Sequence, residues 1–346
     1  MAFKIFDPKQ KVENLYSTVA EPMWSDAAGT ITTFFTGSTQ NTNNGKYYND
    51  VYTTTDDSLE TQFSVTYGHR LGSGSEASTT AGTSNPTKGI YSQFRQVLLP
   101  PESTQFNFGG YLSDDFYAIV IQRARYREKV DPGNWELHLK SGSMHIGVNT
   151  GSTVHLIDDS GANADASLGS SKREFNIVSG SIANGIHTTS TATATATNSG
   201  SYGLFYPEMG IILLNPRALG STDVDVSKYV REPSLSATTN DFNHRDMVDS
   251  IKSGSYFAAR REEQKRSSFY FCEIRAGEFN HSQNPSFVTG TNAELVNSSF
   301  ISEPNTYITS VGLYNNNNEL LAVAKLSKPF RKDSNTEALI KVRLDY

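Results

Sequence analysis

Strict alternation of apolar and polar side chains in residues 134–140 constrains the fold of this chain more than any other feature. A repeat of two places successive side chains on opposite faces of a β-strand. We therefore predict an antiparallel strand that turns one face to the core and the other to water. The apolar phase consists of Trp135, Leu137 and Leu139, and the polar phase consists of Glu136, His138 and Lys140.

Similar strand signals recur along the chain, and the composition agrees with them. Charged residues make up 19% of the chain, below the roughly 25% of an ordinary globular protein, whereas aromatic residues reach 11%. Aromatic side chains favour strands. We predict a mainly β fold of antiparallel, sandwich-like sheets joined by long polar loops. The expected strands cover residues 31–35, 50–54, 62–67, 116–121, 134–140, 153–157, 174–178, 269–274, 306–314, 319–326 and 339–344.

Turn-forming residues separate several of these strands. Residues 131–134 read Asp-Pro-Gly-Asn, which predicts a turn before the strand at residues 134–140. Four asparagines at residues 315–318 join two apolar runs, and they predict a hairpin because asparagine tolerates left-handed backbone conformations. Residues 71–88 are almost entirely small and polar, which predicts a long loop.

One segment, residues 241–264, has the pattern of a helix of appreciable length. Met247 and Ile251 would line its apolar stripe, residues 260–265 would form its solvated end, and Gly254 interrupts the pattern. The expected organisation is then N-terminal strands with an arm, a flexible loop, a central β domain, and the helix with a C-terminal sheet. The central β domain and the C-terminal part are either two separate domains or one continuous domain. The corresponding ranges are residues 1–70, 71–90, 91–235 and 236–346.

Several classes of protein are excluded by composition. No apolar run approaches the about 20 residues that a membrane-spanning helix needs, so we expect a soluble protein without a membrane partner. A net charge of −6 argues against a nucleic-acid partner. The first residues lack the charged start and apolar run of a signal peptide. The single cysteine, Cys272, cannot form an intrachain disulfide, and we expect it to be a buried, inert thiol.

Motifs that would indicate catalysis are missing from the sequence, which contains no HExxH, Walker phosphate loop or GxSxG elbow. We therefore expect no enzymatic activity, no cofactor and no metal. His138 and His155 fall on the polar phase of their strands, which predicts solvated surface histidines rather than ligands. Asp158, Asp159 and Asp165 lie in a loop of small residues, where we expect a solvated turn, with a calcium site as the alternative.

Two groups of arginines stand out. Arg123, Arg125 and Arg127 alternate along what we expect to be a strand extension, and Arg260 and Arg261 lie near the end of the expected helix. Either these side chains form local ion pairs and keep the protein soluble, or they dock onto an acidic partner surface, since arginine is enriched at interfaces.

The C-terminal strands and the asparagine turn resemble a known pattern. Residues 307–325 are similar to I-T-x-[IV]-G-L-Y-[DN]-x-x-[GN]-E-L-x-A-V-[AG]-K, which recurs in virion proteins of tailed bacteriophages, including the attachment region of tail-collar fibre proteins. Residues 277–287 resemble the E-F-N-x-S-x-N-P element of structural proteins from large contractile-tailed phages, including those of marine cyanobacteria. Asparagines replace the usual Asp-Gly of the turn.

This resemblance implies a non-enzymatic structural protein of the phage tail, a wedge or peripheral subunit of the baseplate. It implies several copies in three- or six-fold arrangement around the tail axis, and other tail and baseplate proteins as partners. The protein would be made in the host cytoplasm and become part of the virion. The expected partner contacts, through edge strands, loops and arginine-rich faces, are Arg123, Arg125, Arg127, Arg260, Arg261, Phe279, Asn280, Asn284, Pro285, Gly312 and Tyr314.

Three other functions compete with this interpretation. A neck or connector protein would share the same structural features. A host-recognition protein would bind surface glycans through exposed aromatic side chains such as Tyr47, Tyr48 and Tyr52. A polysaccharide-degrading tail enzyme is the least supported, because the sequence shows no long repetitive β-helix.

Overall fold

The chain divides into two compact units in the computed structural model. Unit 1 comprises Met1–Thr18 and Gln264–Tyr346, and unit 2 comprises Val19–Glu263. This division differs from the expected boundaries after residues 70, 90 and 235, because strands from both sides of those boundaries pair within one sheet. The structure describes residues 4–24, 30–36, 47–53, 60–75, 85–140, 153–160, 174–183, 186–188, 200–220, 229–235 and 242–345.

Unit 2 is built on one large sheet whose paired strands run antiparallel, which confirms the mainly β prediction. The strand order through this unit is β16-β9-β10-β11-β14-β15-β8-β5-β4-β3, and β2 pairs with β16 at one edge. Their bounds are β2 Thr30–Ile31, β3 Phe35–Thr36, β4 Tyr48–Tyr52, β5 Phe63–His69, β8 Asp115–Ile121, β9 Lys129–Lys140, β10 Thr153–Asp158, β11 Phe175–Ser179, β14 Gly203–Tyr206, β15 Ile211–Leu214 and β16 Phe257–Ile274.

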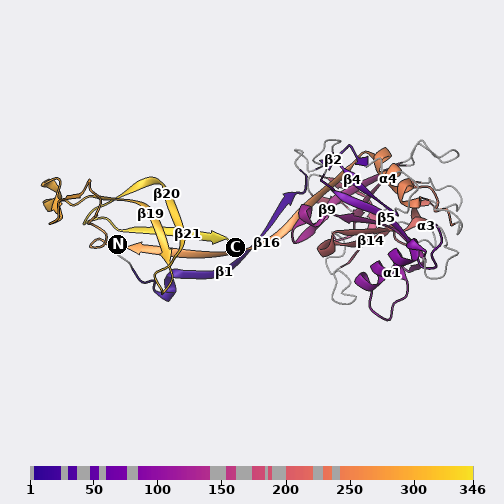
Figure 1. Ribbon diagram of the computed structural model, residues 1–346, viewed down its shortest axis with the longest axis horizontal. Helices are drawn as coiled ribbons and strands as arrows, with labels where there is room; N and C mark the ends of the chain where they lie inside the picture. Colours follow the sequence, from indigo (N-terminus) through magenta and orange to yellow (C-terminus); the bar gives the residue numbers. More distant parts are fainter. Residues whose placement is uncertain are drawn as a thin grey trace. The chain divides into compact units, whose positions relative to one another are not determined.

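Helices and short hairpins complete this unit (Figure 1). The helices are α1 (Pro86–Leu98), α2 (Arg123–Tyr126), α3 (Pro216–Gly220) and α4 (Asn243–Gly254), and Pro207–Met209 forms a single 3-10 turn. The hairpins pair β6 (Phe106–Phe108) with β7 (Tyr111–Ser113), and β12 (Ser181–Ala183) with β13 (Ile186–Thr188). No helix in the described ranges is long and apolar enough to cross a membrane.

Apolar side chains cover both faces of the central strands. In β15, Ile212 and Leu214 belong to one buried cluster, which includes Met247 and Ile251 of α4. The neighbouring side chains of β15 face a second cluster, which includes Tyr91 of α1. Two helices on opposite faces explain why β15 is apolar throughout, because both of its faces are buried.

The sheet curves around the cluster that contains α4. This helix contacts both β9 and β5, which are far apart in the strand order. The rings of Phe63 in β5 and Phe257 in β16 lie edge to face, with centroids 5.4 Å apart. Strands at distant positions in the sheet therefore share one core, and β9 lies on its wall.

The predicted turn at residues 131–134 is wrong, because these residues lie inside β9. The register against β16 runs from Trp135 opposite Ala259 to Val130 opposite Arg261, so the extra residues of β9 form a bulge. Gly133 has φ 78° and its backbone N–H donates to both carboxylate oxygens of Asp158, at 3.0 and 2.8 Å. Pro132 and Gly133 thus bend β9 at the bulge, and the strand continues beyond them.

Helix predictions need two corrections. The helix expected at residues 241–264 ends at Gly254, and Ser255 adopts φ 53°, so residues 257–264 belong to β16 and form no solvated helix end. Residues 86–98 form α1, although residues 71–90 were expected to be a loop and residues from 91 onward a β domain. Pro86 at the first turn and the spacing of Tyr91, Phe94 and Leu98 are the signals of this helix. Residues 76–84 lie outside the described ranges.

Unit 1 contains the C-terminal strands. β21 (Ala338–Asp345) pairs antiparallel with the second half of β16. β19 (Thr306–Tyr314) and β20 (Leu320–Lys332) form a hairpin, as predicted from the asparagines between them. Asn318 has φ 61°, and the side-chain Oδ1 of Asn315 accepts hydrogen bonds from the backbone N–H groups of Asn317 and Glu319. The smaller elements are β1 (Lys11–Pro22), which begins in this unit, β17 (Val288–Thr289), β18 (Glu294–Leu295), α5 (Ser299–Ser302) and a 3-10 turn at Pro8–Gln10.

Gly254 is expected to tolerate no side chain, because an added Cβ would lie 2.1 Å from the backbone oxygen of His138. Replacing it (Gly254→Ala) should push α4 away from β9 and cost about 1–3 kcal/mol of unfolding free energy in urea denaturation. Gly89→Ala is the matched control, since its Cβ would meet nothing within 4 Å in α1. That variant should gain about 0.5–1 kcal/mol from helix propensity. Equal effects of the two substitutions would contradict the close contact.

Candidate functional site

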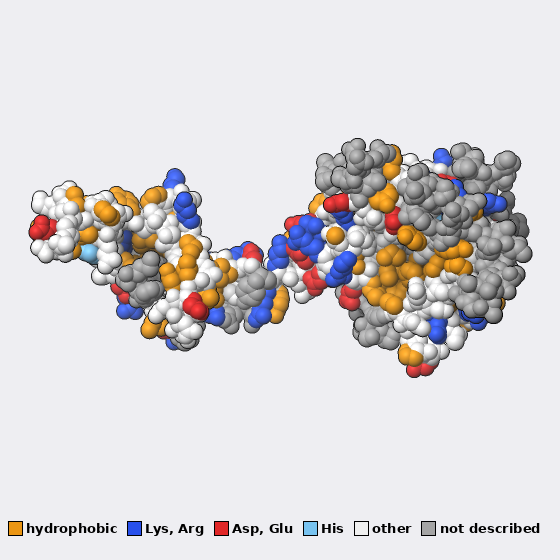
Figure 2. Space-filling model, viewed as in Figure 1, with side chains coloured by type: hydrophobic (Ala, Val, Ile, Leu, Met, Phe, Trp, Pro, Cys, Tyr) orange, Lys and Arg blue, Asp and Glu red, His pale blue; other side chains and the backbone are white. Residues whose placement is uncertain are grey.

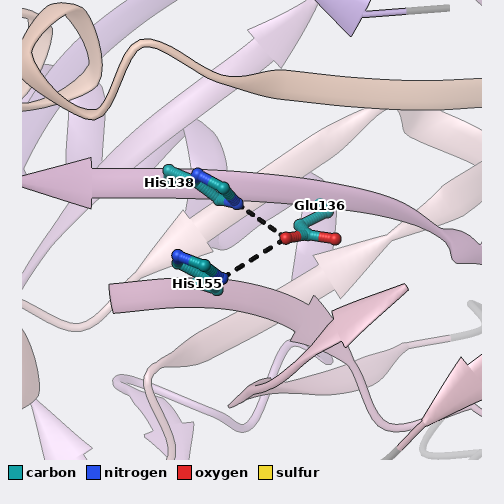
Figure 3. Close-up of side chains that lie close together, drawn as sticks. All are labelled: Glu136, His138 and His155. Carbon is teal, nitrogen blue, oxygen red and sulfur yellow. Dashed lines mark hydrogen bonds and ion pairs between the residues drawn. The ribbon is translucent and has the colours of Figure 1, made fainter. Parts of the chain in front are cut away.

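A carboxylate and two imidazoles come together on the polar face of β9 and β10 (Figure 3). Glu136 and His138 are two residues apart in β9, so their side chains leave the strand on the same face. His155 of β10 is the register partner of His138 across the antiparallel pair. Strand geometry alone therefore places the three side chains side by side.

Both imidazoles are directed toward one oxygen of Glu136. His138 Nε2 lies 2.6 Å from Glu136 Oε1, and His155 Nδ1 lies 3.5 Å from the same atom. The two imidazole rings are nearly parallel, with centroids 3.7 Å apart and an interplanar angle of 8°. Tyr256 stacks on His138 at 4.3 Å, so that ring has an aromatic neighbour on each face.

The second oxygen of Glu136 is held by the backbone. Its Oε2 accepts a hydrogen bond of 2.8 Å from the N–H of Ile182 in β12. The β12–β13 hairpin packs against β9 and leaves Glu136 only 5% exposed. A buried carboxylate with two donors keeps a fixed orientation, because losing either partner would leave an unsatisfied charged oxygen.

Burial and hydrogen bonding act in opposite directions on the ionisation of these groups. Burial raises the pKa of Glu136, but the hydrogen bonds from His138 and Ile182 and the charges of the two histidines outweigh it, and the pKa is lowered overall. Burial, and then the charge of His138, lower the pKa of His155 in spite of the attraction of Glu136. The site therefore favours an ionised Glu136 beside a neutral His155.

The expectation of two solvated histidines is wrong for His138, whose side chain is 17% exposed. His155 is 45% exposed, so it reaches solvent. The sequence shows that His138 and His155 lie on the polar phases of their strands, and it shows the Glu-x-His spacing of Glu136 and His138. The sequence does not show the register that sets His155 opposite His138. The other described histidines with described side chains lie elsewhere: His69 organises the turn after β5, His244 is buried in α4, and His281 is exposed in unit 1.

The aspartates considered for calcium form no solvated turn. Asp158 is fully buried, and both of its oxygens accept the N–H of Gly133 in the β9 bulge. Asp159 accepts hydrogen bonds from the backbone and side-chain nitrogens of Asn176. Both carboxylates thus accept hydrogen bonds from protein N–H groups. Asp165 lies outside the described residues.

The arginine segment 123–127 is not a strand extension, because residues 123–126 form the short helix α2 and Arg127 has φ 55°. Residues two apart on a helix point in different directions. Arg123 donates to the backbone oxygen of Glu208, and Arg125 pairs with Glu60. Arg127 pairs with Glu263 at 2.9 Å, close to the start of unit 1 in the sequence.

Arg260 and Arg261 lie on β16 and also have partners within unit 2. Arg261 pairs with Glu21, and Arg260 Nε lies 3.9 Å from Asp131 Oδ2. Arg260 and Arg261 are thus neighbours on β16, Arg127 lies between α2 and β9, and Arg123 and Arg125 belong to α2. All five arginines make local ion pairs or hydrogen bonds within unit 2.

Motif residues 279–285 serve different purposes in unit 1. Asn280 donates to the backbone oxygen of Ala276 and accepts from Lys332, and the carbonyl of Phe279 accepts from Thr306. Asn284 and Pro285 are exposed. The first two residues therefore hold the segment against the hairpin strands, whereas the last two remain at the surface.

Gly312 and Tyr314 are brought together in β19. An added Cβ on Gly312 would lie 2.9 Å from Cε2 of Tyr314 and 3.2 Å from Cδ1 of Leu320. The glycine thus leaves room for the tyrosine ring to fold back over the strand, a pairing that offsets the weak strand propensity of glycine. Cys272 of β16 is half-buried, and burial raises the pKa of its thiol, which agrees with an inert side chain.

Comparison with protein-family models, with curated proteins and with solved structures finds no significant match to this chain.

Replacing the carboxylate of Glu136 by an amide (Glu136→Gln) should destabilise unit 2 by about 1–3 kcal/mol, because an amide offers one acceptor oxygen to two donors. Urea denaturation followed by tryptophan fluorescence measures this loss. Glu102→Gln, at an exposed position, is the matched control and should change stability by less than about 0.5 kcal/mol. Indistinguishable midpoints for the two variants would show that the hydrogen bonds of Glu136 contribute nothing.

Proposed function

We propose that this protein is a non-enzymatic structural subunit of a tailed-phage virion, in the baseplate of a contractile tail, and that unit 1 binds neighbouring subunits. The observation that carries the proposal is the exposure of apolar side chains in unit 1, while unit 2 buries two apolar clusters of its own.

Apolar side chains reach the surface of unit 1 among polar ones (Figure 2). The buried apolar side chains in its described part are Ile274, Phe287, Leu313 and Val342. More of them are exposed: Ile5, Phe6, Val12, Tyr16, Val296, Ile301, Tyr307, Leu320, Leu321, Val323 and Leu339. Burial of apolar area is the main force that offsets chain entropy, so this unit needs further burial to be stable. Contiguous exposed apolar surface marks interaction sites.

The hairpin of β19 and β20 is a two-stranded sheet, and no third strand pairs with it in the described part of the chain. An isolated two-stranded hairpin is at best marginally stable in water. Its outer edges offer unpaired backbone N–H and C=O groups, which readily accept a strand from another chain. Leu321 and Val323 are 67% and 62% exposed on β20, so added strands or a packed neighbour would cover them.

A buried lysine holds the β19–β20 hairpin in place within unit 1. Lys332 at the end of β20 is fully buried, and its Nζ donates to Ala276 O, Asn280 Oδ1 and Asp333 O at 2.6–2.7 Å. A buried ammonium persists only when its donors are satisfied. The contact ties β20 to Ala276 and to Asn280, and Asn280 belongs to the second segment that resembles phage structural proteins.

The resemblance supports the phage assignment, and its two motif-bearing segments lie in unit 1. Many residues in the ranges 277–287 and 307–325 are exposed to solvent. A virion subunit would contact its partners through such exposed segments. A neck position would use the same surfaces. Glycan binding gains less support, because among the three tyrosines considered for it only Tyr48 is exposed.

Charged substitutions on the exposed face of β20 should abolish assembly. We expect the double variant Leu321→Asp and Val323→Asp to lose both self-association in sedimentation velocity and incorporation into tails in a complementation assay. Its unit 2 should remain folded, because the substitutions lie in unit 1. Localisation of the wild-type chain by immunoelectron microscopy distinguishes the baseplate from the neck.

Leu112→Asp is the matched control, because Leu112 is a 56% exposed leucine on β7 of unit 2. This variant should assemble like the wild type. Normal assembly of the double variant, or equal loss in the control, would contradict a binding role for unit 1.

A further inference from the structure

We propose that Glu136, His138 and His155 bind a transition-metal ion, with Zn²⁺ as the best match, on the face of β9 and β10 beneath the β12–β13 hairpin. The site lies in unit 2 and is independent of the assembly role proposed for unit 1.

The three side chains offer one ligand atom each, and these atoms all lie within 4.8 Å of one another. Zn²⁺ bonds to imidazole nitrogen and carboxylate oxygen at about 2.0–2.2 Å, so ligand atoms in a zinc site are separated by only a little more than 3 Å. The distances of 2.6 and 3.5 Å from Glu136 Oε1 to the two imidazole nitrogens bracket that separation. The spacing of the ligand atoms therefore suits a zinc ion once the side chains have rotated toward it.

The donor set selects the class of metal. Two imidazoles and one carboxylate suit Zn²⁺ and its neighbours in the first transition row, whereas Mg²⁺ and Ca²⁺ prefer sites made of oxygen. Three protein ligands leave the fourth position of a tetrahedral zinc ion for water. His155 reaches solvent, so an ion has a route into the site.

Supporting contacts hold two of the three ligands in position. The N–H of Ile182 binds Glu136 Oε2 and leaves Oε1 directed at the imidazoles. Tyr256 stacks on His138 and limits the rotation of its ring. Such outer contacts orient the ligands of metal sites and strengthen binding. Here they come from β12 and from the residue that precedes β16, so the fold fixes them.

His155 is the ligand that must move. The lone pair of an imidazole nitrogen lies in the plane of its ring, and the rings of His138 and His155 are almost parallel, with centroids 3.7 Å apart. Two parallel planes at that spacing do not meet at one ion. Binding therefore requires the exposed ring of His155 to tilt, which breaks its stack with His138.

The test is a titration of the full chain, freed of metal by a chelator, with ZnCl₂ in an isothermal calorimeter. We expect one ion per chain and a rise in thermal midpoint, because an ion that binds the folded state alone stabilises it. In NMR spectra the ring protons of His138 and His155 should shift together as the stack opens. MgCl₂ and CaCl₂ should produce none of these effects.

His155→Ala should weaken zinc binding by more than about 100-fold, since losing even an outer contact typically costs 10–100-fold. His155 is partly exposed, so this variant should fold. Glu136→Gln should weaken binding as well, and His281→Ala, which removes an exposed histidine of unit 1, should leave it unchanged.

Failure of the wild-type chain to bind zinc would overturn the proposal. So would unchanged affinity in His155→Ala, or a loss in His281→Ala as large as in His155→Ala, since either would place the ion elsewhere. These outcomes leave the assembly of unit 1 untouched, so the two proposals fail separately.

Discussion

Burial of one face of β9 is the constraint on which the rest of unit 2 depends. Trp135, Leu137 and Leu139 are fully buried in the cluster that also contains Met247 and Ile251 of α4. Because strand side chains alternate, this burial commits Glu136 and His138 to the opposite face. A slip of one residue in register would reverse both faces, so the core and the polar site are fixed by the same interaction.

The two units solve the same physical problem differently. Unit 2 curves its sheet until distant strands share a core, and covers the other face with α1 and the β6–β7 hairpin. Unit 1 exposes more large apolar side chains than it fully buries, and it uses polar contacts such as those of Lys332 to hold its segments together. A chain that buries apolar area in one unit and exposes it in the other has a natural surface for association.

Sequence patterns predicted the strands well and their connections poorly. The alternating segments lie in or beside strands of the structure except residues 123–127, which enter α2, and the four asparagines form the expected hairpin turn. Residues 257–262 pair with β9, and this pairing supplies backbone hydrogen bonds that outweigh the local preference for a helix. Residues 131–134 do have turn chemistry, but they form a bulge inside β9 instead of ending it. The helix α1 was missed because the small polar residues before it resemble a continuing loop.

The sequence by itself determined the mainly β class and the face on which each side chain of residues 135–140 lies. Only the tertiary structure decided that His155 lies opposite His138, that Ile182 reaches Glu136, and that the arginines have partners within their own unit. The physical reason is that alternation is a local property of a strand, whereas register and curvature depend on segments distant in the chain. The pairs of residues that lie opposite each other across a sheet depend on those distant contacts, so they cannot be predicted from the sequence of one strand.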